Sequence, residues 1–151
     1  MTIESAKLIS DAVFLALTVW REARGEPYEG KVAVARSVLN RVSRPAWWGN
    51  DVLTVVTKKW QFSSLTDPND RQLTTWPASQ DARWWECVQI ARDLIHGAHL
   101  PNPAPGADSY YAVSISAPKW ATPETFVAQV GNHRFYNLDR DVEKEESCPV
   151  S

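Results

Sequence analysis

The sequence predicts one mainly α-helical domain, with a central buried helix and a minor β or extended part. Apolar residues recur every three or four positions through most of the chain up to residue 96, which is the period of a helix. The two stretches that favour extended backbone, SYYAVSI and GNHRFYNL, both come late. A length of 151 residues suits one domain with a real core, and no repeat or linker divides it.

The first predicted helix spans residues 3–23. It has apolar residues at positions 8, 12, 15 and 19, and also at positions 13, 14, 16 and 17. A helix that is apolar on nearly all sides is buried among other elements, so this segment is the predicted central helix. Gly25 and Pro27 end it.

The same period predicts three further helices: residues 28–43, a short helix after Asn50, and residues 79–96. Thr122-Pro123 predicts the start of a fifth helix of about six residues, because proline favours the first helical position. SYYAVSI, at 109–115, is predicted to form a short strand. GNHRFYNL, at 131–138, closes the domain as an extended segment.

Charge and composition exclude some classes of function. The net charge of −2 and the pI near 5.9 argue against a nucleic-acid binder, which carries a basic footprint. Residues 139–151 hold five acidic and two basic residues and almost no apolar ones, so they predict a solvated, flexible tail. The eight tryptophans exceed what a small core needs, and some could line a groove.

The chain is expected to be made in the cytoplasm as a monomer without a cofactor. The N-terminus MTIESAKLIS does not follow the pattern of a signal peptide. No apolar run reaches the ~18 residues of a membrane span, so no membrane insertion is expected. Cys87 and Cys148 are predicted to be free thiols, because two cysteines at this spacing do not make a disulfide framework.

Glu22 is the first candidate catalytic residue. It continues the three-four spacing of the buried stripe, so it lies at the end of an apolar face. Burial and the negative end of the helix dipole favour its protonated form, while Arg21 and Arg24 oppose this. A carboxyl held this way can act as a general acid. Alternatively, Glu22 only pairs with Arg24 or Arg36 at the helix end.

The stretch REARGEPYEGKVAVARSVLNRV resembles the signature of cell-wall hydrolases of the spore cortex-lytic type. WQFSS at 60–64, GADSYYA at 106–112 and GNHRFY at 131–136 match the same family in order, so the resemblance covers about residues 11–137. The sequence departs from the family at Arg21, where glycine is usual, and at Ser64-Leu65, where cysteine or tryptophan is frequent.

The resemblance implies a lysozyme-like fold, an α+β variant that is mainly helical, whose cleft binds the glycan strands of peptidoglycan. It implies cleavage between N-acetylmuramic acid and N-acetylglucosamine, with Glu22 as catalytic acid. Spore-type members resemble lytic transglycosylases, in which the muramic 6-hydroxyl attacks the anomeric carbon and a 1,6-anhydro end forms. Substrate-binding roles follow for matched residues: Gln61, Ser63, Tyr110, Tyr111, Asn132 and His133. Strand alternation lets only one of the two tyrosines face the cleft.

A hydrolytic muramidase is the alternative, and it needs a second carboxylate. Retaining enzymes place it about 5–5.5 Å from the acid, and inverting ones roughly 6.5–9.5 Å away. Glu26 is the nearest candidate, although a charge at a helix start also has a structural use. Other acids stand in loops of unknown position, namely Asp51, Asp67, Asp70 and Asp108. The one-carboxyl mechanism is therefore preferred.

Two other classes compete. His96 and His99, with His133, could suggest a zinc amidase, but Gly97 interrupts the pair and no HExxH pattern is present. We therefore expect no metal. A non-catalytic carbohydrate-binding or virion structural module would keep the aromatic residues without needing Glu22. As a setting, we expect a bacteriophage endolysin that reaches the periplasm or cell wall after release. A delivered antibacterial effector is the alternative.

Overall fold

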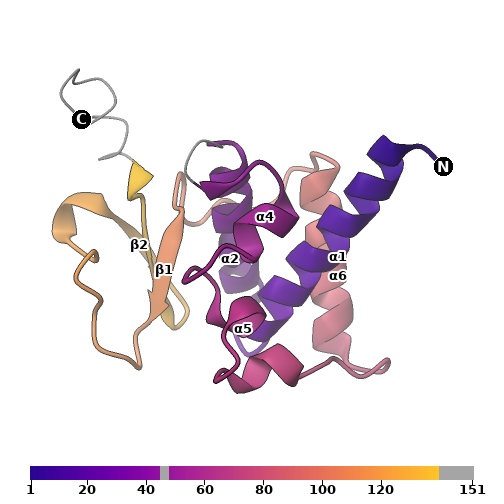
Figure 1. Cartoon of the computed structure of the whole chain (residues 1–151). Helices are drawn as coiled ribbons and strands as arrows, with labels where there is room; N and C mark the ends of the chain where they lie inside the picture. Colours follow the sequence, from indigo (N-terminus) through magenta and orange to yellow (C-terminus); the bar gives the residue numbers. More distant parts are fainter. Residues whose placement is uncertain (45–47, 140–151) are drawn as a thin grey trace.

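The computed structural model describes residues 1–44 and 48–139 (Figure 1). The helices are α1 (Ile3–Ala23), α2 (Tyr28–Val42), α4 (Val52–Val56), α5 (Ser63–Thr66) and α6 (Ala82–Ile95). Two 3₁₀ turns are η1 (Arg71–Thr74) and η2 (Pro123–Thr125), and the strands are β1 (Ser109–Ala112), β2 (Phe126–Val130) and β3 (His133–Tyr136). The helices form one body, and the small sheet lies at one side of it.

Helix α1 is the element around which the other helices pack. It contacts α6, α2, α4 and α5. Thr2 and Ser5 form a capping box that satisfies the first backbone amides. The second half of the helix, from Leu15 onward, is mostly buried, which confirms the predicted central helix there. The first turns are different, because apolar residues such as Leu8 and Val13 are exposed.

The other predicted helices are also present, with small shifts at their ends. Helix α2 buries Val32, Val34 and Val38 against the core. Asp51 and Thr54 form a capping box at the start of α4. Helix α6 begins three residues later than predicted, at Ala82, because the Asp81 side chain caps the Arg83 amide.

The three strands form an antiparallel sheet in the order β1-β3-β2. Tyr110 pairs with Phe135 and Tyr111 with Arg134, so neighbours along each strand point to opposite faces. Tyr110 contacts the rings of His133 and Phe135 on one face, and Tyr111 stacks on Tyr136 on the other. SYYAVSI and GNHRFYNL therefore contain strands, as predicted.

The predicted fifth helix after Thr122 is wrong. Pro123 does begin a helical turn, but η2 ends at Thr125 and the chain continues as strand β2. The backbone of β2 pairs with β3, with an irregularity between Phe126 and Ala128. Pairing with a neighbouring strand satisfies the backbone groups that a helix would have paired internally.

Within residues 1–44 and 48–139, no helix is both long and apolar enough to cross a membrane. Cys87 is a free thiol in the core, and burial raises its pKa to about 12. Cys148 lies outside the described residues. So does most of the predicted flexible tail, whose first residue, Asp139, is buried.

Candidate active site

Glu22 lies in the last turn of α1, half-buried, and faces strand β1 of the sheet. The Tyr110 hydroxyl donates a hydrogen bond to Glu22 Oε1 at 2.7 Å. The suggested arginine partners are engaged elsewhere: Arg24 binds Gln72 at 2.7 Å, and Arg36 binds the carbonyl oxygens of Leu100 and Pro101. Among the described residues, the Tyr110 hydroxyl is the hydrogen-bond partner of the Glu22 carboxylate.

Tyr110 is the tyrosine that faces Glu22, which the sequence left open. Its ring is enclosed by His133, at 5.1 Å between ring centroids, and by Phe135, at 5.5 Å. Burial, and then the negative charge of Glu22, raise the pKa of Tyr110 well above its ordinary value. The phenol therefore stays protonated and remains a hydrogen-bond donor to the carboxylate.

Arg41 is a site residue that the sequence analysis missed. Its buried guanidinium donates to the Asp108 carbonyl at 2.6 Å and to Gln61 Oε1 at 3.3 Å. It also lies over the rings of Trp48 and Phe62. Burial lowers its pKa, and electrostatic interactions with Tyr110, Asp108 and Glu22 oppose this. Its place in the matched helix, one turn after Val38 on the core-facing side, is the signal that could have found it.

A pocket of about 330 Å³ opens beside Tyr110. Its lining combines four aromatic residues, three polar or charged residues and one leucine, namely Trp48, Trp60, Tyr110, Trp120, Arg41, Gln61, Ser109 and Leu138. Gln61 lines this pocket, and its role in substrate binding stays a prediction. Ser63 is exposed instead and donates to Asp70 at 2.6 Å. This mixture of aromatic surface and a few polar groups is typical of small-molecule sites.

Glu26 binds the turn between β2 and β3. Its Oε1 accepts from the Asn132 amide at 2.7 Å, and its Oε2 accepts from the Asn132 side chain at 3.0 Å. His133 Nδ1 lies 3.3 Å from the same Oε1, and both side chains are under 10% exposed. Gly131, at φ +58°, leaves room for this approach, because an added Cβ would stand 2.7 Å from Glu26 Oε1.

Asn132 and His133 therefore contact Glu26, and His133 also lies against Tyr110. Tyr111 faces away from Glu22, on the opposite side of the sheet. A second pocket of about 570 Å³ lies there, against Tyr111, Phe126, Arg134 and Tyr136. The structure thus brings Glu22, Tyr110 and Gln61 to one side and separates Tyr111 from them.

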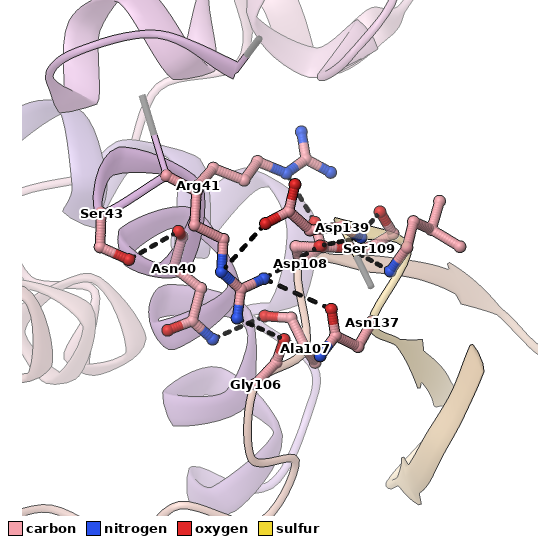
Figure 2. Close-up of polar contacts among 11 residues, drawn as sticks. Asn40, Arg41, Ser43, Gly106, Ala107, Asp108, Ser109, Asn137 and Asp139 are labelled. Atoms are coloured by element: carbon pink, nitrogen blue, oxygen red, sulfur yellow. Dashed lines mark hydrogen bonds and ion pairs between the residues drawn. The ribbon is translucent and has the colours of Figure 1, made fainter. Parts of the chain in front are cut away.

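Asp108, another candidate acid, is a structural carboxylate (Figure 2). It is 0% exposed and forms an ion pair with Arg44 at 3.1 Å. Its oxygens also accept from the Ser109 hydroxyl and from the amides of Leu138 and Asp139, at 2.9–3.0 Å. This network ties the residues after β3 to the end of α2.

Arg21, where the sequence departs from the family pattern, also has a structural use. Its guanidinium donates to the carbonyl oxygens of Thr75 and Ser64 and lies 4.7 Å from the centre of the Trp76 ring. Burial lowers its pKa. Arg21 thus joins the end of α1, next to Glu22, to the segment from α5 to η1. In the described part of the chain, no cluster of three or more His, Cys, Asp or Glu side chains could hold a metal ion.

A family described as Cell Wall Hydrolase matches residues 25–136. The chain belongs to this family of cell wall hydrolases. The matched span starts three residues after Glu22 and includes Glu26, Arg41, Gln61 and Tyr110.

Curated relatives of this cell wall hydrolase are spore cortex-lytic enzymes. The chain is 30% identical over 128 residues to the one from Halalkalibacterium halodurans and 31% identical over 126 residues to the one from Bacillus subtilis. These alignments cover 85% and 83% of this chain but 35% and 37% of the relatives. The chain thus spans about a third of the length of these relatives.

Two solved structures share the fold. One is the catalytic domain of the germination-specific lytic transglycosylase SleB from Bacillus anthracis, with a TM-score of 0.64 and 29% identity over 83% of this chain and 93% of that one. The other is the catalytic domain of Bacillus cereus SleB, with a TM-score of 0.65, 29% identity, and 83% and 88% coverage. The predicted lysozyme-like, mainly helical fold is confirmed.

Proposed function

We propose that the chain cleaves peptidoglycan glycan strands between N-acetylmuramic acid and N-acetylglucosamine, acting as a monomeric lytic transglycosylase. The observation that carries this proposal is the contrast among its carboxylates. Within the described residues, Glu22 Oε2 has no hydrogen-bond donor, and Glu22 Oε1 is bound by Tyr110, which lines the pocket, whereas Glu26 and Asp108 each have both oxygens engaged by hydrogen-bond donors. Of these three carboxylates only Glu22 is available, which suits the one-carboxyl mechanism better than the two-carboxylate mechanisms of hydrolysis. The relatives named as spore cortex-lytic enzymes and as a lytic transglycosylase support the same chemistry.

Glu22 acts first as an acid and then as a base. Its protonated carboxyl gives a proton to the glycosidic oxygen, and the bond from that oxygen to the muramic anomeric carbon breaks. The carboxylate then takes the proton of the muramic 6-hydroxyl while that oxygen bonds to the anomeric carbon. A 1,6-anhydro ring forms, and Glu22 returns to its protonated state without consuming water.

The internal hydroxyl has an advantage over an outside water. It is already held near the anomeric carbon, and such positioning can lower a barrier by roughly 7–11 kcal/mol at best. Tyr110 orients the carboxyl through Oε1, which leaves Oε2 for proton transfer. Arg41 holds Gln61 Oε1, so the Gln61 amide nitrogen is left to bind the substrate acetamido group.

The product distinguishes transglycosylation from hydrolysis. Purified peptidoglycan is digested, half of the sample is reduced with borohydride, and the masses of the muropeptides in both halves are measured by mass spectrometry. The proposal expects muropeptides lighter by one water than hydrolysed ends, with masses unchanged on reduction. Products that gain two hydrogens are reducing sugars and would make the chain a muramidase. A parallel digestion in EDTA, with zinc added back, tests for a metal amidase.

The proposed setting is bacteriophage-mediated lysis, in which the chain is made in the bacterial cytoplasm and reaches peptidoglycan after release. Expression in a bacterium with and without a co-expressed holin tests this setting. Lysis that depends on the holin supports it. Lysis without the holin would mean that the chain leaves the cytoplasm by another route.

A further inference from the structure

Trp60, in the turn between α4 and α5, is held in an unusual way. Its side chain is 82% exposed, although indole is costly to leave in water. Among the described residues other than glycine, Trp60 is the one with a left-handed backbone, at a φ of 71°. That conformation costs free energy for a bulky residue, and such strain gathers at ligand-binding sites. Trp60 begins the matched WQFSS stretch, and the proposed chemistry gives it no role.

Trp60 lines two pockets. One is the pocket beside Tyr110, which also contains Gln61. The other, also of about 330 Å³, is lined by Lys59, Trp60, Thr66, Asp67, Pro68 and Asn69, and we call it the Asp67 pocket. A linear ligand that fills the first pocket would cross the indole to enter the second.

The chemistry of the Asp67 pocket fits a sugar. The flat indole offers an apolar surface for the C–H face of a pyranose ring. Around it stand a carboxylate, an amide and an ammonium group, from Asp67, Asn69 and Lys59, which can bond hydroxyl and acetamido groups. Lys59 Nζ lies 4.8 Å from the centre of the Trp60 ring, which steadies the indole in its outward position.

We propose that the Asp67 pocket is an additional glycan subsite and that Trp60 is the aromatic surface on which the strand stacks as it extends there from the pocket beside Tyr110. Its occupant is an N-acetylhexosamine of the strand that is being cleaved. This inference rests on the proposed function, because it assumes that the glycan strand is bound and cleaved at Glu22. Trp60 is then a specificity-determining residue that makes the enzyme prefer long strands.

Binding without turnover provides the test. Glu22→Gln protein is titrated with N-acetylglucosamine oligomers of two to six sugars, and binding is followed by tryptophan fluorescence and by calorimetry. Adding Trp60→Ala is expected to weaken binding of the longest oligomer on the order of tenfold, as removal of a central aromatic anchor does. The disaccharide, which meets Trp60 from the pocket beside Tyr110 alone, should lose less affinity than the longest oligomer. Trp60→Phe should restore part of the affinity.

Trp85→Ala is the matched control. Trp85 is 55% exposed on α6, lines neither pocket, and donates its indole hydrogen to the Ser79 carbonyl. It should leave binding at every oligomer length unchanged. Trp60→Gly adds a second test, because glycine accepts the left-handed backbone. This variant should melt at the same temperature or about 2–4 °C higher, yet bind long oligomers as poorly as Trp60→Ala.

Some results would overturn the subsite. The subsite would be excluded if the Trp60→Ala and parent proteins bound the longest oligomer with equal affinity. It would also be excluded if Trp60→Ala lost the same affinity at every oligomer length. Unfolding of Trp60→Gly would make Trp60 a structural residue instead. Failure of the proposed function looks different: wild-type protein would then leave peptidoglycan intact, whatever the oligomer titrations give.

Discussion

Glu22 and Asp108 both lie where the helices meet the sheet, but the protein surrounds their carboxylates in opposite ways. Asp108 is fully buried and accepts from a guanidinium, a hydroxyl and two backbone amides. Glu22 is half-buried and, within the part of the chain that the structure describes, accepts one hydrogen bond, from Tyr110. Donors on both oxygens hold a carboxylate in one place and leave neither oxygen for a ligand, whereas one donor leaves an oxygen within reach of a substrate.

The two carboxylates also differ in what they hold together. Asp108 connects the α2 end to the residues after β3, so it maintains the position of the sheet beside the helices (Figure 2). Glu22 touches that sheet through Tyr110, and the position of Tyr110 depends on the same junction. Removing Asp108 should therefore affect stability first, and removing Glu22 should affect chemistry first.

The largest expected effect is on activity. Glu22→Gln should lower the rate of peptidoglycan cleavage by about 10²–10⁴-fold, because a general acid contributes on that order. The amide keeps the size of the carboxyl, so the melting temperature should change little. The rate of cleavage is measured as the loss of turbidity of purified peptidoglycan, and the melting temperature is measured by circular dichroism. Glu29→Gln, at the exposed first turn of α2, is the matched control. A folded Glu22→Gln protein with wild-type cleavage would remove Glu22 from the mechanism.

Asp108→Asn should instead destabilise the fold. Losing the charge of a buried, paired carboxylate costs about 3–5 kcal/mol, and the new amide group would face backbone donors. For a chain of this size, each kcal/mol shifts Tm by about 2–4 °C, so the loss is readily measured by calorimetry. Asp93→Asn, in a more exposed pair with Arg92, should change stability by under about 1 kcal/mol. Cleavage by the fraction of Asp108→Asn protein that stays folded should be near normal.

Tyr110→Phe tests the contact that links the two regions. The phenylalanine ring keeps the packing on His133 and Phe135 but removes the hydrogen bond to Glu22. A hydrogen bond to a charged group contributes about 1.5–3 kcal/mol, so cleavage should fall roughly ten- to a hundredfold if that energy orients the carboxyl. Tyr111→Phe, on the other face of the sheet, is the control and should cleave normally. Equal losses in both variants would mean that the sheet, and not this bond, matters.

The sequence predicted those parts of this comparison that depend on local spacing. Glu22 was placed at the end of a buried stripe because positions three and four apart share a helix face. The strand alternation correctly separated Tyr110 from Tyr111. Even so, the short helix after Thr122 was wrong, because pairing with β3 decided the structure of residues 126–130.

The long-range contacts could not be predicted from local pattern. Glu26 meets Asn132 across 106 residues, and Asp108 meets Arg44 across 64. No spacing rule brings such residues together, since the fold must first position α1, α2 and the sheet. Arg41 was missed for a related reason. A charged residue on a helix is expected at the surface, and its burial is compensated by Gln61 and the Asp108 backbone.

The smallest expected effect concerns stability at high pH. The folded-state pKa of Tyr110 is raised, first by burial and then by Glu22, with Arg41 opposing. A tyrosine in the unfolded chain titrates near pH 10. Below that pH both states keep the proton, so Tyr110 adds no pH dependence. Above it the unfolded chain loses the proton first, and stability falls as pH rises toward the folded pKa.

Urea unfolding between about pH 8 and pH 11, around the ordinary tyrosine pKa, measures this decline. The midpoint should fall less steeply above pH 10 in Tyr110→Phe than in the wild-type protein. Glu22→Gln removes one cause of the raised pKa, so its decline should be intermediate. Tyr111→Phe tests whether the effect belongs to this face of the sheet, because Tyr111 is also shifted upward but lies next to Tyr136. If Tyr110→Phe and wild type decline in parallel, the phenol does not keep its proton beside Glu22, and its assignment as the permanent donor to that carboxylate fails.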